Sequence, residues 1–315
     1  MSKSRGIRAA MNKPQSPKSK VQSPKYKIVK PVYAKKSFGQ NFLVEENDID
    51  KIIAALDPQT GETIIEIGAG RGALTAKLIE SGAKVVAVEL ERDMIAVLRE
   101  QFASEKNFRL VESDALKIDF AEIIQIPDSR FQIPDSKTKE QRPKTKDQNT
   151  KCKLIANLPY YISTAILQKL IEQKDVFSEM ILMFQREVVE RITAEAGNSE
   201  RGFLSVLAQA HLETEKLFDV PPSAFRPSPK VTSAVVRLTP KANFEIKNVS
   251  LFRELVSAAF AQKRKTIYNN LKNAPSSLRV KIGDLSDFLE KCRIAPNRRA
   301  ETLTIEEWRC LCNFL

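Results

Sequence analysis

The sequence predicts an α/β fold in which a mostly parallel sheet is covered by helices and a small helical region follows. Between residues 63 and 194, short apolar runs alternate with segments whose apolar side chains recur every three or four residues. A glycine-rich loop directly follows the first apolar run, as expected where a strand turns into a helix. After residue 240 the periodicity is helical, without strand-like runs.

Each element of the alternating region is placed by its pattern. The predicted strands are Thr63–Ile67, Lys84–Leu90, Phe108–Glu112, Lys153–Ala156 and Met180–Phe184. The predicted helices are Ala73–Glu80, Arg92–Phe102, Thr164–Gln173 and Glu187–Ala194. Strands joined by crossover helices run parallel, so we expect their carboxyl ends to meet at one edge of the sheet.

The pattern changes after the last of these helices. Phe203–Leu212 is apolar, and Leu217–Val220 and Val231–Leu238 are bounded by prolines, which is consistent with an antiparallel pair that closes the sheet. Residues 241–315 are expected to form a separate small domain, with Leu251–Asn270 as its clearest helix.

The charge is distributed unevenly along the chain. The 315 residues include 51 Lys+Arg and 39 Asp+Glu, for a net charge of +12. Residues 1–36 contain eleven basic and no acidic side chains, and residues 241–315 contain fourteen basic and eight acidic ones. Basic ends suit a polyanionic partner, because neutralising phosphates releases counterions. The alternative is a solubilising tail without a partner.

Two segments read as flexible. Residues 1–35 hold few large apolar side chains and are interpreted as a basic, disordered arm, although an acid-free tail also resembles an organellar transit peptide. Residues 126–150 contain Ile-Pro-Asp-Ser twice and are interpreted as an insertion in a surface loop of a domain spanning 36–240.

Composition excludes several classes of protein. A hydrophobic content of 42% is too high for a wholly disordered chain, and no run of about 18 apolar residues predicts a membrane span. We therefore expect a cytoplasmic protein, and a monomer. Four cysteines and one histidine fit neither a disulfide framework nor a zinc site, so reduced thiols and no metal are expected.

The glycine loop predicts a nucleotide-like ligand. It reads Gly-Ala-Gly-Arg-Gly-Ala from Gly68, which also satisfies the dinucleotide fingerprint and leaves an NAD-dependent dehydrogenase open. Glu89 ends the second strand about twenty residues later, where a carboxylate can accept both hydroxyls of a ribose. Asp114, after the third strand, can accept a hydrogen bond from the exocyclic amine of an adenine. A solvated turn aspartate is the alternative.

The most specific signal is Asn-Leu-Pro-Tyr at 157–160. An exocyclic amine of a nucleobase is a poor nucleophile, because its lone pair is delocalised into the ring. The side-chain oxygen of Asn157 and the main-chain carbonyl of Leu158 could accept the two amine protons and localise that lone pair toward a methyl donor. Pro159 stiffens the turn and Tyr160 offers a face on which the purine can stack.

Seven motifs in order resemble the ribosomal RNA adenine dimethyltransferase family, and most closely its small-subunit branch, over residues 36–315. They are Lys-Ser-Phe-Gly-Gln-Asn-Phe-Leu (36–43), Glu-Ile-Gly-Ala-Gly (66–70), Val-Glu-Leu-Glu (88–91), Ser-Asp-Ala-Leu (113–116), Asn-Leu-Pro-Tyr-Tyr (157–161), Gln-Arg-Glu-Val (185–188) and Val-Pro-Pro-Ser-Ala-Phe-Arg-Pro-Ser-Pro-Lys-Val (220–231).

The resemblance implies a Rossmann-like methyltransferase with a seven-stranded, mostly parallel sheet and a helical carboxyl-terminal RNA-binding domain. It implies S-adenosylmethionine as methyl donor, without a metal, and dimethylation of the N6 of two adjacent adenosines near the 3′ end of 16S rRNA in an immature small subunit. The implied cofactor residues are Asn41, Leu43, Gly68, Glu89, Asp114 and Asn157.

The resemblance also places Phe225 opposite Tyr160 across the extruded base, although phenylalanine burial habits alone favour a core position. Arg226, Lys230 and the run Lys263, Arg264 and Lys265 are candidates for phosphate contacts, or a solvated surface.

Two other functions remain open at this stage. One is the sister branch that dimethylates large-subunit rRNA in macrolide resistance, and the other is a non-catalytic ribosome-assembly factor of the same fold.

Overall fold

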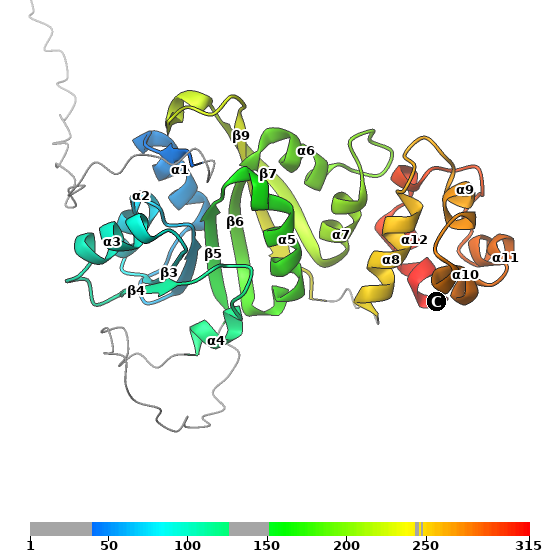
Figure 1. The fold of residues 1–315 in the computed structure, drawn as a ribbon, viewed down its shortest axis with the longest axis horizontal. Helices are drawn as coiled ribbons and strands as arrows, with labels where there is room; N and C mark the ends of the chain where they lie inside the picture. The colour runs from blue at the N-terminus through cyan, green and yellow to red at the C-terminus, as the bar shows by residue number, and fades with distance from the viewer. Residues whose placement is uncertain (1–39, 126–150, 243–245, 247) are drawn as a thin grey trace, which may run out of the picture.

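The structure is a computed structural model that describes residues 40–125, 151–242, 246 and 248–315, apart from the side chain of Tyr160. At its centre lies a seven-stranded sheet with the order β4-β3-β2-β5-β6-β9-β7 (Figure 1). Its strands are β2 (Thr63–Ile67), β3 (Lys84–Glu89), β4 (Phe108–Glu112), β5 (Cys152–Asn157), β6 (Phe177–Gln185), β7 (Leu212–Val220) and β9 (Ser233–Pro240).

The pairing of the strands confirms the mostly parallel sheet. β2 pairs in parallel with β3 and with β5, and the parallel set continues to β4 on one side and to β6 on the other. β9 runs antiparallel to both β6 and β7, so the predicted antiparallel pair closes the sheet. Because β2 and β5 are neighbours, the glycine loop and the Asn-Leu-Pro-Tyr turn emerge side by side.

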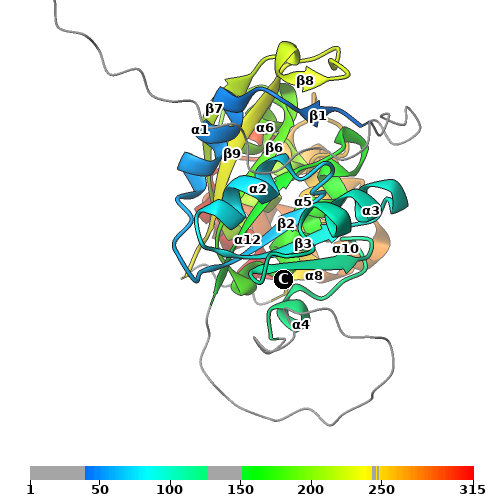
Figure 2. The same cartoon turned by 90° about the vertical axis from the view of Figure 1, so that its left-hand side faces the viewer.

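Helices cover both faces of the sheet (Figures 1 and 2). They are α1 (Glu46–Leu56), α2 (Ala73–Glu80), α3 (Arg92–Gln101), α4 (Phe120–Ile124), α5 (Ser163–Glu172), α6 (Arg186–Thr193) and α7 (Phe203–His211). Alternation along each strand divides the core: Ile64 packs with α1, α2 and α3, whereas its neighbour Ile65 packs with α5, α6 and α7.

A short antiparallel ribbon lies over the carboxyl edge of the sheet. It joins β1 (Phe42–Leu43) to β8 (Phe225–Arg226), with Leu43 opposite Phe225, and was not expected from the sequence. The main-chain N–H of Val44 donates to the carbonyl of Ala224 over 2.9 Å and extends the ribbon. The ribbon therefore brings two distant parts of the chain together beside the glycine loop.

The carboxyl-terminal residues are helical, as predicted. They form α8 (Val249–Ala259), α9 (Ile267–Lys272), α10 (Ser276–Ile282), α11 (Leu285–Lys291) and α12 (Ile305–Asn313), at the far end of the molecule from β4 (Figure 1). Their buried side chains, including Phe252 and Trp308, belong to the same hydrophobic cluster as α7 and one face of the sheet. The helices are thus joined to the sheet by one continuous core.

The prediction of a single helix over Leu251–Asn270 is wrong. α8 ends at Ala259, and α9 begins after Thr266, whose hydroxyl caps it by accepting from the main-chain N–H of Asn269 over 3.2 Å. The buried amide of Asn270 donates to the carbonyls of Ala259 and Gln262, and so satisfies groups that the broken helix leaves unpaired. The basic run 263–265 therefore lies in an exposed turn.

The prediction of four reduced thiols is also wrong for one pair. Cys292, which follows α11, is disulfide-bonded to Cys310 in α12, with the Cα atoms 5.8 Å apart. Sequence spacing could not show this, because the pair forms only where the two helices pack together. Cys152 and Cys312 are free and buried, and burial raises the pKa of the Cys152 thiol to about 12.

Two predicted features lie outside the described residues, namely the basic arm at 1–35 and the insertion around 126–150. Among the residues that are described, none of the helices has the length and apolar character needed to cross a bilayer.

The single histidine lies where α7 meets α8. His211 is 4% exposed, and its ring faces that of Phe252 edge-on with the centroids 6.3 Å apart. Burial, together with the charge of Lys174, lowers the pKa of His211 to about 4, and Asp175 opposes this shift. The ring is therefore neutral at the join between the sheet layer and the carboxyl-terminal helices.

We predict that His211 makes the folded protein sensitive to acid. The unfolded state takes up a proton on His211 near pH 6.5 and the folded state only near pH 4, so this contribution to stability is complete above pH 6.5 and lost as the pH falls through 4. A shift of this size corresponds to up to about 3 kcal/mol. Urea unfolding of wild type and His211→Gln at pH 7 and pH 4 measures the free energy of unfolding. The decrease between pH 7 and pH 4 should be smaller in the variant, and equal decreases would contradict the assignment.

Candidate active site

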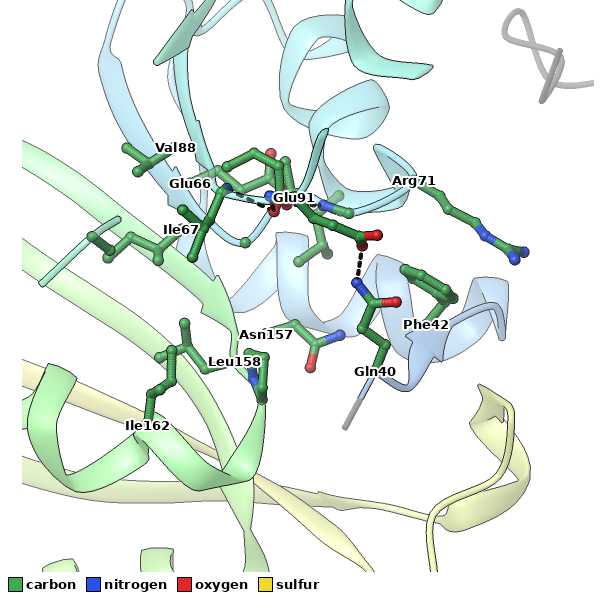
Figure 3. A pocket seen from close by; sticks show the side chains of 18 of the residues that line it. Gln40, Phe42, Glu66, Ile67, Arg71, Val88, Glu91, Asn157, Leu158 and Ile162 are labelled. Carbon is green, nitrogen blue, oxygen red and sulfur yellow. Dashed lines mark hydrogen bonds between the residues drawn. The ribbon is translucent and has the colours of Figure 1, made fainter. Parts of the chain in front are cut away.

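A cleft opens at the carboxyl edge of the parallel strands and encloses about 1180 Å³, including the part open to solvent. Its walls come from the segments that follow β2, β3, β4 and β5, from the residues around β1, and from Phe225 in β8 (Figure 3). Ligands of open α/β sheets bind in this position, because the loops after the strands diverge there.

The cleft brings together the predicted site residues. Those that line it are Asn41, Leu43, Gly68, Glu89, Asp114, Asn157, Leu158, Pro159 and Phe225. The backbone of Tyr160 begins the short helix η3 (Tyr160–Ile162) next to them, and its side chain is not described. These residues come from six separate segments of the chain, so only the fold makes them neighbours.

The glycine loop packs directly against the turn after β5. Gly68 has a φ of +73°, and a Cβ added there would lie 3.6 Å from the main-chain oxygen of Asn157. Gly72 has a φ of +77°, and a Cβ there would lie only 2.6 Å from the ring of Phe102, which follows α3. Both glycines therefore permit a left-handed backbone, and Gly72 also permits a close approach that a larger residue would prevent.

The Glu89 carboxylate is held in place by the backbone around it. It accepts hydrogen bonds from the main-chain N–H groups of Gly70 at 2.9 Å, Leu90 at 2.8 Å and Glu91 at 2.9 Å. Because a carboxylate has about four acceptor positions, capacity remains for a hydroxyl group in the cleft. Glu89 is thus oriented before any ligand arrives.

Asp114 lies in a turn after β4. One of its side-chain oxygens accepts from the main-chain N–H of Leu116 over 3.0 Å, as in an Asx turn. Asp114 is therefore a turn residue and also lines the cleft. Its other side-chain oxygen can accept a hydrogen bond from a ligand amine.

The turn after β5 is rigid. Asn157 ends the strand opposite Met183 of β6, and Leu158 is 3% exposed. The main-chain N–H of Ile162 donates to the carbonyl of Pro159 over 3.2 Å and leads into α5. The amide side chain of Asn157 is directed into the cleft, as Figure 3 shows.

Phe225 is at once a core residue and part of the cleft wall. Its side chain is 1% exposed and belongs to the hydrophobic cluster under α1 and α2. The interpretation as a core residue is therefore confirmed, and the residue also lines the cleft, whereas its place opposite Tyr160 across a base stays a prediction.

The segment before β1 crosses the cleft and is fastened at two points (Figure 3). The side-chain amide of Gln40 donates to the carboxylate of Glu91, in the loop after β3. The guanidinium carbon of Arg71, in the glycine loop, lies 4.3 Å from the ring centroid of Phe42. The sequence reading missed all four residues, since their pairing spans separate segments.

Glu66 is a further cleft residue to which the sequence reading gave no role. It is 1% exposed, and its carboxylate accepts from the Thr75 hydroxyl over 2.6 Å. Burial is the main cause that raises the pKa of Glu66 to about 7; the hydrogen bonds from Thr75 oppose this rise, and the charge of Glu89 adds to it. The sequence does contain a signal for this residue, because Glu66 is an acidic residue inside the apolar run Thr63–Ile67. Burying a carboxyl group there costs free energy, which indicates a functional role.

Comparison with known proteins decides the family. The family model described as ribosomal RNA adenine dimethylase matches residues 32–315. The chain belongs to this family. It is 39% identical to the ribosomal RNA small subunit methyltransferase A of Saccharophagus degradans, over 90% of this chain and 94% of that protein. The protein of the same name from Clostridium botulinum is 38% identical, over 87% and 90% of the two chains. Membership excludes the dehydrogenase reading.

Solved structures agree on the Rossmann-like methyltransferase fold. The dimethyladenosine transferase of Plasmodium falciparum superposes with a TM-score of 0.66 at 24% identity, over 86% of this chain and 95% of that one. The 23S rRNA methyltransferase ErmE gives a TM-score of 0.61 at 21% identity, over 87% and 99%. At these identities, the similarity of the two structures to this chain shows a shared fold.

We predict that Glu66→Gln stabilises the ligand-free dimethylase at alkaline pH. The folded state holds a proton on Glu66 up to about pH 7 and the unfolded state only up to 4.5, so this contribution to stability is present below pH 4.5 and lost as the pH rises through 7. Glutamine does not ionise, so the variant avoids the cost of a buried charge. Its free energy of unfolding should exceed that of the wild type by up to about 3 kcal/mol at pH 8 and by less at pH 5.

Urea unfolding at the two pH values measures this difference. Glu100→Gln on the exposed side of α3 is the matched control, and it should leave the pH dependence unchanged. A Glu66→Gln protein with the wild-type pH dependence would show that Glu66 titrates normally.

Proposed function

We propose that this enzyme dimethylates the N6 atoms of two adjacent adenosines near the 3′ end of 16S rRNA, in an immature small ribosomal subunit. The observation that carries the proposal is the position of the Asn157–Pro159 turn, which lines the cleft and lies against Gly68 of the ligand loop. Relatives of up to 39% identity are named small-subunit methyltransferases, which favours this branch over the large-subunit enzymes and over a purely structural assembly factor.

The polar groups of the cleft fit S-adenosylmethionine. Glu89 is placed for ribose hydroxyls and Asp114 for the adenine amine, while Asn41, Leu43 and the glycine loop line the same space. The buried carboxylate of Glu66 needs a cationic counterpart, and this cofactor carries a sulfonium and an ammonium group. When bound, the cofactor supplies an electrophilic methyl group.

The protein's own part in the reaction is to hold and activate the target amine. The side-chain oxygen of Asn157 and the main-chain carbonyl of Leu158 accept its two hydrogens, which localises the nitrogen lone pair. Pro159 fixes the turn, and Tyr160 and Phe225 hold the extruded base between them. The amine proton becomes acidic once the nitrogen is alkylated, so positioning carries the catalysis, for which about 7–11 kcal/mol is attainable.

The RNA is contacted by basic side chains on both parts of the molecule. Arg226 is exposed beside the cleft, and Lys263, Arg264 and Lys265 are exposed in the turn between α8 and α9. Charged side chains of this kind hold the phosphate backbone. We assign the methyltransferase domain to residues 36–240 and the RNA-binding helical domain to 241–315, and we expect a cytoplasmic monomer.

We predict that Asn157→Ala abolishes methyl transfer while cofactor binding is largely retained. Loss of one pre-aligned polar group in such a site costs at least about 10²-fold in kcat. Methyl incorporation into small subunits, together with calorimetric titration of S-adenosylmethionine, separates the two effects. Asn47→Ala, on the exposed side of α1, is the control. Wild-type turnover in Asn157→Ala would refute the role of this side chain.

The substrate itself is tested with labelled methyl donor and unmethylated ribosomal subunits. The wild-type enzyme should modify 30S subunits and leave 50S subunits unmodified, and mapping of the modified bases should give two adjacent N6,N6-dimethyladenosines. Label in the 50S subunit alone would overturn the proposed substrate.

A further inference from the structure

An exposed aromatic ring stands at the cleft and has no role in the mechanism above. Among the described residues, Tyr161 and Phe314 are the aromatic side chains that are largely exposed, at 66% and 52%. Only Tyr161 lines the cleft. An aromatic ring left in water forgoes the stabilisation of burial, so its position at the mouth of a binding site suggests a ligand.

The ring of Tyr161 is presented on a rigid base. Tyr161 lies in η3, which is closed by the hydrogen bond from Ile162 to Pro159 and continues directly into α5. On either side of it, Leu158 and Ser163 are each 3% exposed, and Ile162 packs on the core. The backbone is therefore held on both sides, while the side chain projects outward. This lowers the entropy cost of ordering the site when a ligand binds.

The chemistry of the ring matches a nucleobase. Aromatic side chains stack on single-stranded bases of any sequence, because every base has a π face. Leu90 is the other large apolar side chain that is exposed at the cleft, at 56%. Leu90 adjoins Glu89 and so lies on the side proposed for the cofactor, whereas Tyr161 adjoins the turn proposed to grip the target amine.

We propose that Tyr161 forms a second nucleotide subsite, on which the base next to the target adenosine stacks. This inference rests on the proposed function, in which two adjacent adenosines are modified. When one of them occupies the cleft, a single phosphodiester tethers the other at the mouth, where the ring of Tyr161 stands. The subsite holds the neighbouring base unpaired and unstacked from the target.

The test compares substrates that retain one target. Small subunits are assembled from 16S transcripts in which either adenosine is replaced by guanosine, which stacks well, or by uridine, which stacks poorly. The wild type should have a higher kcat/KM for subunits with the guanosine neighbour than for those with the uridine neighbour. Tyr161→Ala should lower kcat/KM about tenfold for the guanosine substrate and much less for the uridine substrate. Tyr161→Phe retains the ring and should retain the preference.

The controls separate this subsite from other effects. Phe314→Ala removes an exposed ring that does not line the cleft, and it should leave the preference at the wild-type value. Thermal unfolding and S-adenosylmethionine affinity of Tyr161→Ala should equal those of the wild type, which shows that the fold and the cofactor site are intact.

The outcomes distinguish the subsite from the proposed function. Suppose that the wild type modifies small subunits, but that Tyr161→Ala lowers kcat/KM equally for the guanosine and uridine substrates, or leaves it unchanged, at both target positions. The subsite is then refuted and the proposed function stands. If the wild type modifies no small subunit, the proposed function fails and the subsite fails with it.

Discussion

The close contact between the loop after β2 and the turn after β5 is the constraint on which the site depends. Gly68 lies against the main-chain oxygen of Asn157, and its φ of +73° is a backbone conformation that residues with a side chain rarely adopt. The contact exists because β2 and β5 are adjacent parallel strands whose carboxyl ends share one edge. The separation between the proposed cofactor site and the proposed base site is consequently set by hydrogen-bonded strands.

Electrostatics of the cleft follow from the same arrangement. Three main-chain N–H groups hold the Glu89 carboxylate, so it is oriented before a ligand binds. Glu66 is buried and accepts from Thr75, and burial is the main cause that raises the pKa of this carboxyl to about 7. The cleft thus combines one satisfied and one strained carboxylate, a pattern typical of a site that sacrifices stability for binding.

The sequence predicted the layers of the fold and nine of the residues that line the cleft, because strand periodicity and loop motifs are local properties. It failed where structure depends on distant contacts. The break between α8 and α9 is stabilised by the buried amide of Asn270, which helical periodicity cannot reveal. The Cys292–Cys310 disulfide and the Gln40–Glu91 hydrogen bond likewise join segments with no shared pattern. The roles of the site residues, unlike their positions, remain predictions.

The continuous core that joins the carboxyl-terminal helices to the sheet has a consequence for substrate selection. Phe252 of α8 and Trp308 of α12 are fully buried in the cluster that also contains α7. The exposed cations at 263–265 are therefore carried on a stiff frame rather than a swinging arm. The phosphate contacts proposed for these side chains and the base site proposed in the cleft then lie at a fixed distance from each other, which an RNA must span to occupy both.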